Sequence, residues 1–320
     1  MLSAASSRLG FALPDSQKVA FNAFMDLSPR LATVLVEQHL ERFGREVMAR
    51  VADFLDDAIA ESAIEKRGVI RGFFTRLLKR HSLRVATLNY DDAIERSMQF
   101  WDGFTPEDPG SLDYASFEKA HVRELLHLHG SIRFAPSPPE VVPKGLPELV
   151  RYQSNKAAAP FRPLPLMQNT FTQAGERVFV GPMLSGLRKT DKLMIEPYNL
   201  YHHRFVSGLL SSPRFLCIGY GGADIYVNAA VAQARRIHGD RFRAVYVTKV
   251  DEDSSPSDLA TLRALTMAAA HSITYAHELD GFLRRLKAAK LCLEENGMLL
   301  ITSGFPLPDP LGDRVAAFLQ

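Results

Sequence analysis

Residues 83–100 have the sequence LRVATLNYDDAIERSMQF, and this stretch decides the fold class. Val85 and Ala86 fit a short, buried apolar strand that precedes a polar turn. After the turn the period changes to that of a helix, with inward positions expected at Ile94, Ser97, Met98 and Trp101. The stretch therefore predicts a strand, a turn and a helix, in that order.

The turn after this strand is polar and holds Thr87, Asn89, Tyr90 and Asp91. Asp91 or Asp92 is expected to cap the helix by accepting hydrogen bonds from the free N–H groups of its first turn. Open α/β sheets bind their ligands at the carboxyl ends of the strands, so these side chains mark a candidate site. The alternative is that Asn and Asp act here only as turn and cap residues, in which they are common.

Two further stretches also begin with a predicted apolar strand. LLHLHGSIRF, residues 125–134, predicts a second apolar strand followed by His129 and Gly130. FLCIGYGGADIYVNAAV, residues 215–231, predicts a third strand, a glycine-rich loop and a helix capped by Asp224. Strands that alternate with helices favour an α/β protein with a doubly wound, mostly parallel, Rossmann-like sheet.

These three stretches resemble, in order and type, the sirtuin-like NAD-binding family. The family pattern is T-x-N-Y-D after one strand, L-H-G after the next and G-Y-x-x-x-D-x-x-(I/V)-N after a later one. This sequence matches the pattern at Thr87, Asn89, Tyr90, Asp91, Leu128, His129, Gly130, Gly219, Tyr220, Asp224, Val227 and Asn228. Each motif alone is weak evidence, whereas the ordered set, which covers residues 83–231, is fairly specific.

The resemblance implies roles for individual residues. Asn89 is expected to position water and the nicotinamide ribose, His129 to act as general base, and Asp91 to order the nicotinamide pocket or its loop. Contacts with NAD are expected from Thr87, Tyr90, Gly130, Gly219, Tyr220, Gly221, Asp224, Ser6 and Thr248. Some of these residues also have a structural interpretation, since Tyr90 can support the loop by packing and Asp224 can fasten its loop to the following helix.

The composition excludes several classes of protein. The chain has 320 residues, of which 46% are hydrophobic, and its 38 Lys and Arg nearly balance 36 Asp and Glu. This balance argues against nucleic acid or an acidic membrane as a partner. Cys217 and Cys292 are the only cysteines, so the chain cannot build the four-cysteine zinc module of deacylating sirtuins. We expect a zinc-free, metal-free cytoplasmic protein without a membrane span or signal peptide.

The sequence also predicts features before the first motif and after the second. Residues 4–10 include Ala4, Ala5, Ser6 and Gly10, and are either the remnant of a phosphate-binding Gly-rich loop or a polar leader without a role. Apolar positions at helical spacing predict a helical layer over residues 16–80. Residues 135–180 form a proline-rich insertion, because eight of the nineteen prolines lie between Ala135 and Pro165. This insertion is either a lid over the NAD site or a variable loop.

We expect one sirtuin-like NAD-binding domain over residues 1–296 and a tail over residues 297–320 that is loose or packs as an appendage. Within the domain, FRAVYVTKV at residues 242–250 predicts a strand and HSITYAH at residues 271–277 a last short strand. Residues 278–293 predict an amphipathic helix.

Cleavage of NAD between nicotinamide and ribose releases a neutral leaving group from a cationic pyridinium, so no strong general acid is required. The catalyst must stabilise an oxocarbenium-like centre and admit one nucleophile. The resemblance therefore implies an NAD glycohydrolase that forms nicotinamide and ADP-ribose, with a role in anti-phage defence. NAD is then the substrate, and a homo-oligomer or a regulatory protein is the expected partner.

Two alternatives remain open. The chain can be a module that binds NAD or ADP-ribose, or serves in assembly, without turnover. It can also be an NAD-dependent protein deacylase or ADP-ribosyltransferase, which the missing zinc cysteines disfavour.

Overall fold

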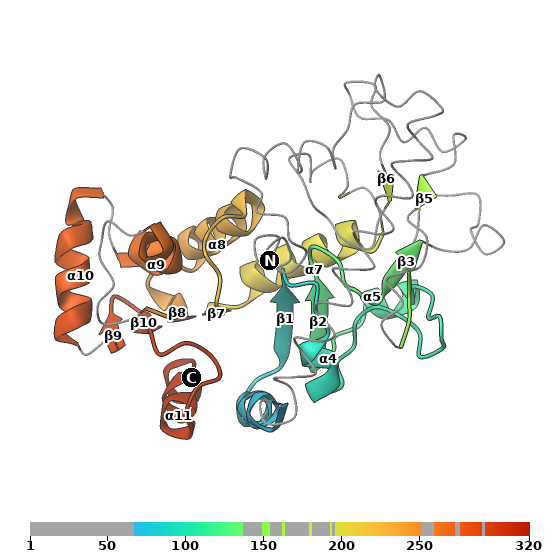
Figure 1. Ribbon diagram of the computed structural model, residues 1–320, viewed down its shortest axis with the longest axis horizontal. Coiled ribbons are helices and arrows are strands. Elements are labelled where there is room, and N and C mark those ends of the chain that lie inside the picture. Colours follow the sequence, from blue (N-terminus) through green and yellow to red (C-terminus); the bar gives the residue numbers. More distant parts are fainter. Residues whose placement is uncertain are drawn as a thin grey trace, which may run out of the picture. The chain divides into compact units, whose positions relative to one another are not determined.

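A computed structural model gives the fold (Figure 1). It describes residues 67–136, 149–153, 162–163, 179–180, 193, 196–250, 259–272, 276–289 and 292–320. The chain divides into two compact units. The first unit contains Arg84–His203, and the second contains Gly68–Leu83 and Arg204–Gln320. Each unit is described by itself.

The first unit is built around two strands, β1 (Leu83–Thr87) and β2 (Arg123–His127), which form a two-stranded sheet. Their arrows point the same way in Figure 1. Two short helices, α4 (Ala93–Ser97) and α5 (Tyr114–Phe117), lie between the strands in the sequence. The predicted strands and the turn between β1 and α4 are confirmed, although Val85 and Ala86 are only half-buried.

Hairpin-like pairs follow β2. β3 (Phe134–Pro136) pairs antiparallel with β4 (Leu149–Arg151), and β5 (Arg162–Pro163) pairs antiparallel with β6 (Phe179–Val180). The core of the unit forms where β2 meets this region, and Leu125, Leu126 and Ile132 have no exposed surface. Tyr201 is also fully buried, and its hydroxyl donates to the backbone oxygen of Asp102.

The second unit contains a four-stranded sheet in the order β7-β8-β10-β9. β7 (Arg214–Ile218), β8 (Arg243–Val247) and β10 (Met298–Ile301) are parallel, and β9 (Cys292–Glu295) is the antiparallel edge. In the register Leu216 and Leu299 both pair with Val245. These parallel strands and their intervening helices confirm the α/β, Rossmann-like fold class.

Helices cover the sheet of the second unit. They are α7 (Tyr198–Ser211), which begins in the first unit, α8 (Ile225–His238), α9 (Leu259–Ser272), α10 (Leu279–Ala288) and α11 (Asp309–Phe318), with 3-10 turns η2 (Gly239–Arg241) and η3 (Ala276–Glu278). In Figure 1, α8 and α9 lie on one side of this sheet and α11 lies on the other. This two-sided cover is the arrangement expected of a doubly wound sheet.

The C-terminal boundary needs correction. The tail expected from residue 297 supplies β10, in which Met298, Leu299 and Leu300 have no exposed surface, and the packed helix α11. The expected boundary falls inside the turn between β9 and β10. Asn296 and Gly297 form this turn with φ angles of 50° and 75°, as a two-residue turn between antiparallel strands requires.

Two other predicted elements are wrong in part. The helix after Asn89 ends at Ser97 and does not reach Trp101, because the Trp101 N–H and carbonyl bond to Arg123 and Leu125 beside β2. The strand predicted at 271–277 is also absent from its described residues, since His271 and Ser272 end α9 and Ala276 begins η3.

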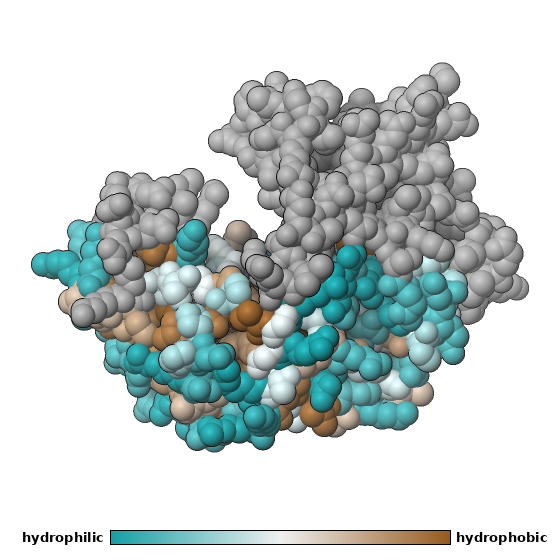
Figure 2. Space-filling model, turned by 60° about the horizontal axis from the view of Figure 1, so that its bottom comes forward, coloured by the Kyte–Doolittle hydropathy of each residue, from teal (hydrophilic) through white to brown (hydrophobic). Residues whose placement is uncertain are grey.

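The predicted N-terminal helical layer lies mostly outside the described residues, as do Ser6 and most of the proline-rich insertion. Within the layer, residues 67–78 are helical and bury Phe73, Phe74 and Leu77. Arg76 of this helix pairs at 2.7 Å with Asp309, the first residue of α11. On the face shown in Figure 2, hydrophilic residues dominate the described surface. In the part of the chain that is described, no helix has the length and apolar character to cross a membrane.

Candidate functional site

The candidate site of the first unit is formed by the two loops that follow β1 and β2. The backbone N–H of Leu128 donates to the carbonyl of Thr87 at 3.0 Å. The N–H of Ile132 donates to the carbonyl of Tyr90 at 2.9 Å. These two hydrogen bonds enclose Asn89 on one loop and His129 on the other, so the two predicted catalytic residues lie on neighbouring segments at one end of the sheet.

The first loop exposes Asn89, leaves Asp91 half-buried and buries Asp92. Asn89 is exposed, and its N–H donates to Oγ1 of Thr87 at 3.1 Å. Oδ1 of Asp91 accepts from the N–H of Ala93 at 3.1 Å, whereas the side chain of Asp92 makes no cap bond. Asp91 therefore accepts a hydrogen bond from a free N–H group at the start of α4. Of the two predicted capping residues, Asp91 and Asp92, Asp91 is the one that makes the bond.

The pKa of the Asp91 carboxyl is raised, chiefly because burial disfavours its charged form. The hydrogen bond from Ala93 opposes this effect, and the nearby Glu95 adds to it. The pKa of Tyr90 is raised to about 12 by burial, so its hydroxyl stays neutral near pH 7. Oδ1 of Asp91 is engaged by the N–H of Ala93 at the start of α4.

The second loop is a tight turn that places His129. The N–H of Gly130 donates to the carbonyl of His127 at 3.1 Å, and Gly130 has a φ of 99°. This conformation favours glycine because a Cβ would crowd the backbone. His129 is 7% exposed and Ser131 is fully buried, so the side chain of His129 lies in a largely dry environment.

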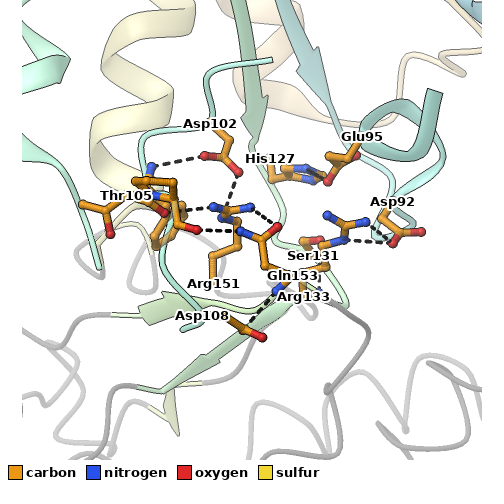
Figure 3. A network of polar contacts seen from close by, with 12 residues as sticks. Asp92, Glu95, Asp102, Thr105, Asp108, His127, Ser131, Arg133, Arg151 and Gln153 are labelled. Atoms are coloured by element: carbon orange, nitrogen blue, oxygen red, sulfur yellow. Dashed lines mark hydrogen bonds and ion pairs between the residues drawn. The ribbon is translucent and has the colours of Figure 1, made fainter. Parts of the chain in front are cut away.

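Ionisable side chains near the two loops form a network of polar contacts (Figure 3). Nε2 of His127 lies 2.8 Å from Oε1 of Glu95, and His127 is 1% exposed. Burial alone would lower the pKa of His127, but the charges of Glu95, Asp102 and Asp91, with the Glu95 hydrogen bond, outweigh it and raise the pKa. The imidazole and Glu95 therefore form a charged pair over a wider pH range than an exposed histidine would.

Two further buried carboxylates are paired with arginines. Asp92, which has no exposed surface, lies 2.8 Å from Nη2 of Arg133 and 2.7 Å from Nε of Arg96. Asp102 lies 3.1 Å from Nε of Arg151. The pKa of Asp102 is raised by burial, against the lowering effect of Arg151. Removal of an arginine partner from such a buried carboxylate is costly, because it leaves a charge that is less well compensated.

The glycine-rich loop of the second unit is fixed by its own side chains. Gly219 and Gly222 have φ angles of 64° and 70°, and Gly219 is exposed. The hydroxyl of Tyr220 accepts from the N–H of Asp224 at 2.8 Å and donates to Oδ1 of Asn228 at 2.8 Å. Nδ2 of Asn228 in turn donates to the carbonyl of Gly222 at 2.7 Å.

Asp224 caps α8, as predicted. Its Oδ1 accepts from the N–H groups of Tyr226 at 2.9 Å and Val227 at 3.3 Å. The helix N-terminus therefore already holds a carboxylate. Gly221, half-buried, lies in the same loop. Thr248 follows β8 in the second unit, and its N–H and carbonyl bond to Ile301 and Gly304.

The structure thus brings together Thr87, Asn89, Tyr90, Asp91, His129 and Gly130 in the first unit, and Gly219, Tyr220, Gly221, Asp224 and Thr248 in the second. No group of three His, Cys, Asp or Glu side chains within the described ranges could hold a metal ion. Sequence reasoning missed the pairs of Glu95 with His127 and Asp92 with Arg133. The signal available was the occurrence of charged residues on both sides of each motif.

A family model described as SIR2-like domain matches residues 83–275, which is more than half of the 320-residue chain. The match contains both loops of the first unit and the glycine-rich loop of the second. No curated protein matches the chain.

Proposed function

Because the chain belongs to the SIR2-like family, we propose that it hydrolyses NAD to nicotinamide and ADP-ribose. One observation carries this proposal. The hydrogen bonds from Leu128 to Thr87 and from Ile132 to Tyr90 hold the Asn89 and His129 segments side by side. A single bound ribose can then be reached by an uncharged amide and by an imidazole.

The chemistry of the reaction fits these two side chains. Nicotinamide leaves as a neutral molecule, so the protein must mainly stabilise an oxocarbenium-like sugar and position water. Asn89 is exposed, and its amide can orient water or a ribose hydroxyl without competing as a nucleophile. His129 can act as the general base that takes a proton from that water or hydroxyl.

We assign each remaining site residue either to supporting a loop or to contacting the substrate. Asp91 and Asp224 already cap helices, so we assign them to ordering the loops around the substrate. Exposed Gly219 lets the backbone approach a dinucleotide closely, and nothing lies within 4 Å of where its Cβ would be. We assign direct NAD contacts to Thr87, Tyr90, Gly130, Gly219, Tyr220, Gly221 and Thr248, and to Ser6 outside the described residues.

Product analysis tests the proposal against its alternatives. Purified full-length protein is incubated with NAD, and nicotinamide and ADP-ribose are quantified by chromatography. Hydrolysis predicts equal amounts of both products with NAD alone. Binding of NAD without product would instead support a sensor or assembly module, and product that requires an acylated peptide would support a deacylase. Label transferred from NAD to protein would support an ADP-ribosyltransferase.

We further propose that NAD depletion by this protein in the cytoplasm serves anti-phage defence, with a homo-oligomer or a regulatory partner restraining it before infection. The support is the sequence resemblance alone. The test is the cellular NAD level during phage infection, which should fall in cells with the wild-type chain and stay level in cells with the Asn89→Ala variant.

A further inference from the structure

Two carboxylates, the buried Asp92 and the half-buried Glu95, form ion pairs on either side of the His129 turn. Glu95 belongs to α4, the helix after the Asn89 loop, and Asp92 directly precedes this helix. Glu95 pairs with His127, two residues before His129, at 2.8 Å. Asp92 pairs with Arg133, four residues after His129, at 2.8 Å. Both pairs therefore connect the helix that follows Asn89 to a segment that flanks His129 (Figure 3).

Because these ion pairs are largely buried, their stability depends on the distance and orientation of the two partners. The side chains of His127 and Glu95 are 2% and 14% exposed, and those of Arg133 and Asp92 are 12% and 1% exposed. Buried charges are costly unless both partners keep good geometry, and loss of one partner leaves the other uncompensated. Each pair consequently favours one separation between α4 and the turn.

We infer that Glu95 and Asp92 are positioning residues for the His129 base, acting through His127 and Arg133 to fix its place relative to Asn89. This inference rests on the proposed NAD hydrolysis. A displacement of about 1 Å in a reacting group can lower the rate about 100-fold. The pairs would therefore control turnover although neither Glu95 nor Asp92 contacts the substrate.

The electrostatics around His127 support a charged pair. Glu95, Asp102 and Asp91 are the carboxylates that act on it, and together they raise its pKa above the usual value despite burial. Loss of the Glu95 charge removes the first of these attractive contributions. Substitution of Glu95 should therefore change both the position of the turn and the protonation of His127.

The chain offers a matched control in another ion pair, which joins β1 directly to β2. Glu124 of β2 is 1% exposed and pairs with Arg84 of β1, near the start of both strands. Like Glu95→Ala, Glu124→Ala removes a paired carboxylate, but at the end of the strands away from Asn89 and His129. The conservative variant Glu95→Gln keeps an oxygen that can accept from His127 and removes only the charge.

Initial rates of NAD turnover by the full-length variants are measured over a range of NAD concentrations, and kcat is corrected for the folded fraction. We expect Glu95→Ala to lower kcat about 100-fold with KM within about threefold, and Glu95→Gln to recover at least tenfold of this loss. Glu124→Ala should keep kcat within about threefold. Equal kcat losses in Glu95→Ala and Glu124→Ala, or no loss in Glu95→Ala, would overturn the inference.

Amide hydrogen exchange provides a measurement that does not depend on NAD hydrolysis. Glu95→Ala should accelerate exchange at the Gly130 and Ile132 amides, which hold the turn and the bond between the two loops, more than Glu124→Ala does. If the wild type releases no nicotinamide, the proposed function fails, and these amides still decide the positioning role. Equal exchange rates at both amides in the two variants would refute it.

Discussion

At the scale of one residue, the backbone conformation at position 130 requires glycine. Its φ of 99° is unfavourable for any residue with a Cβ, so we expect Gly130→Ala to lower the free energy of unfolding by about 1–2 kcal/mol. The same change should reduce NAD turnover, because the turn that carries His129 must shift. Urea denaturation and the rate of nicotinamide release measure the two effects.

Gly72 is a control for this substitution. It lies in the helical segment 67–78, and nothing lies within 4 Å of an added Cβ. Gly72→Ala should therefore raise stability by about 0.5–1 kcal/mol and leave turnover unchanged. Similar stability changes in the two variants would show that the positive φ of Gly130 has no energetic importance.

At the scale of one element, the cap of α8 separates structural from ligand-binding roles in the glycine-rich loop. Asp224→Ala removes the acceptor for two first-turn N–H groups and should cost about 1 kcal/mol of stability. Asp224→Asn keeps a cap oxygen and should cost only a few tenths of a kcal/mol. Thermal denaturation followed by circular dichroism distinguishes these values, and equal losses for Ala and Asn would contradict a capping role.

Local signals were sufficient for the elements next to the site. The polar turn after Thr87, the turn at Gly130 and the cap at Asp224 depend on side chains within a few residues of each other, and all three were predictable. The β9–β10 turn was also signalled, because Asn296-Gly297 between apolar residues is typical of a hairpin. It was missed in favour of an extended helix and a tail.

Contacts between distant residues explain the other errors. Helical spacing suggested that α4 continues to Trp101. The backbone N–H and carbonyl of Trp101 instead form hydrogen bonds with β2, and no pattern in the neighbouring sequence indicates this pairing. The pairing of Glu95 with His127 likewise joins residues 32 positions apart. Such pairs follow from the packing of elements, which single-sequence periodicity does not specify.

At the scale of the whole molecule, the stability of the second unit should depend on pH through His271. Burial, with the charge of Arg235, lowers the pKa of this imidazole to about 4. The unfolded chain binds the proton near pH 6.5, so stability is full above that pH and is lost as the pH falls towards 4. We expect a loss of about 1–2 kcal/mol between pH 7 and 4.5, allowing for partial solvent contact.

The variant His271→Gln tests this dependence, because Gln can accept from Tyr246 and donate to Asn296 as His271 does without titrating. Its stability should fall less than that of the wild type between pH 7 and 4.5, as measured by urea denaturation with far-UV circular dichroism. Trp101, the only tryptophan, lies in the first unit, and its fluorescence reports that unit separately. An identical pH dependence in wild type and variant would contradict the assignment.

The central claim is that Asn89 and His129 act on one bound NAD, and the most direct test is kcat for nicotinamide release by Asn89→Ala and His129→Ala. Each variant should lose at least about 100-fold in kcat, because each removes a group required in the transition state. The exposed residues Gln99 and His203 of the same unit provide the controls Gln99→Ala and His203→Ala, which should keep kcat. Turnover that survives either site substitution, or that falls equally in the controls, would contradict the account.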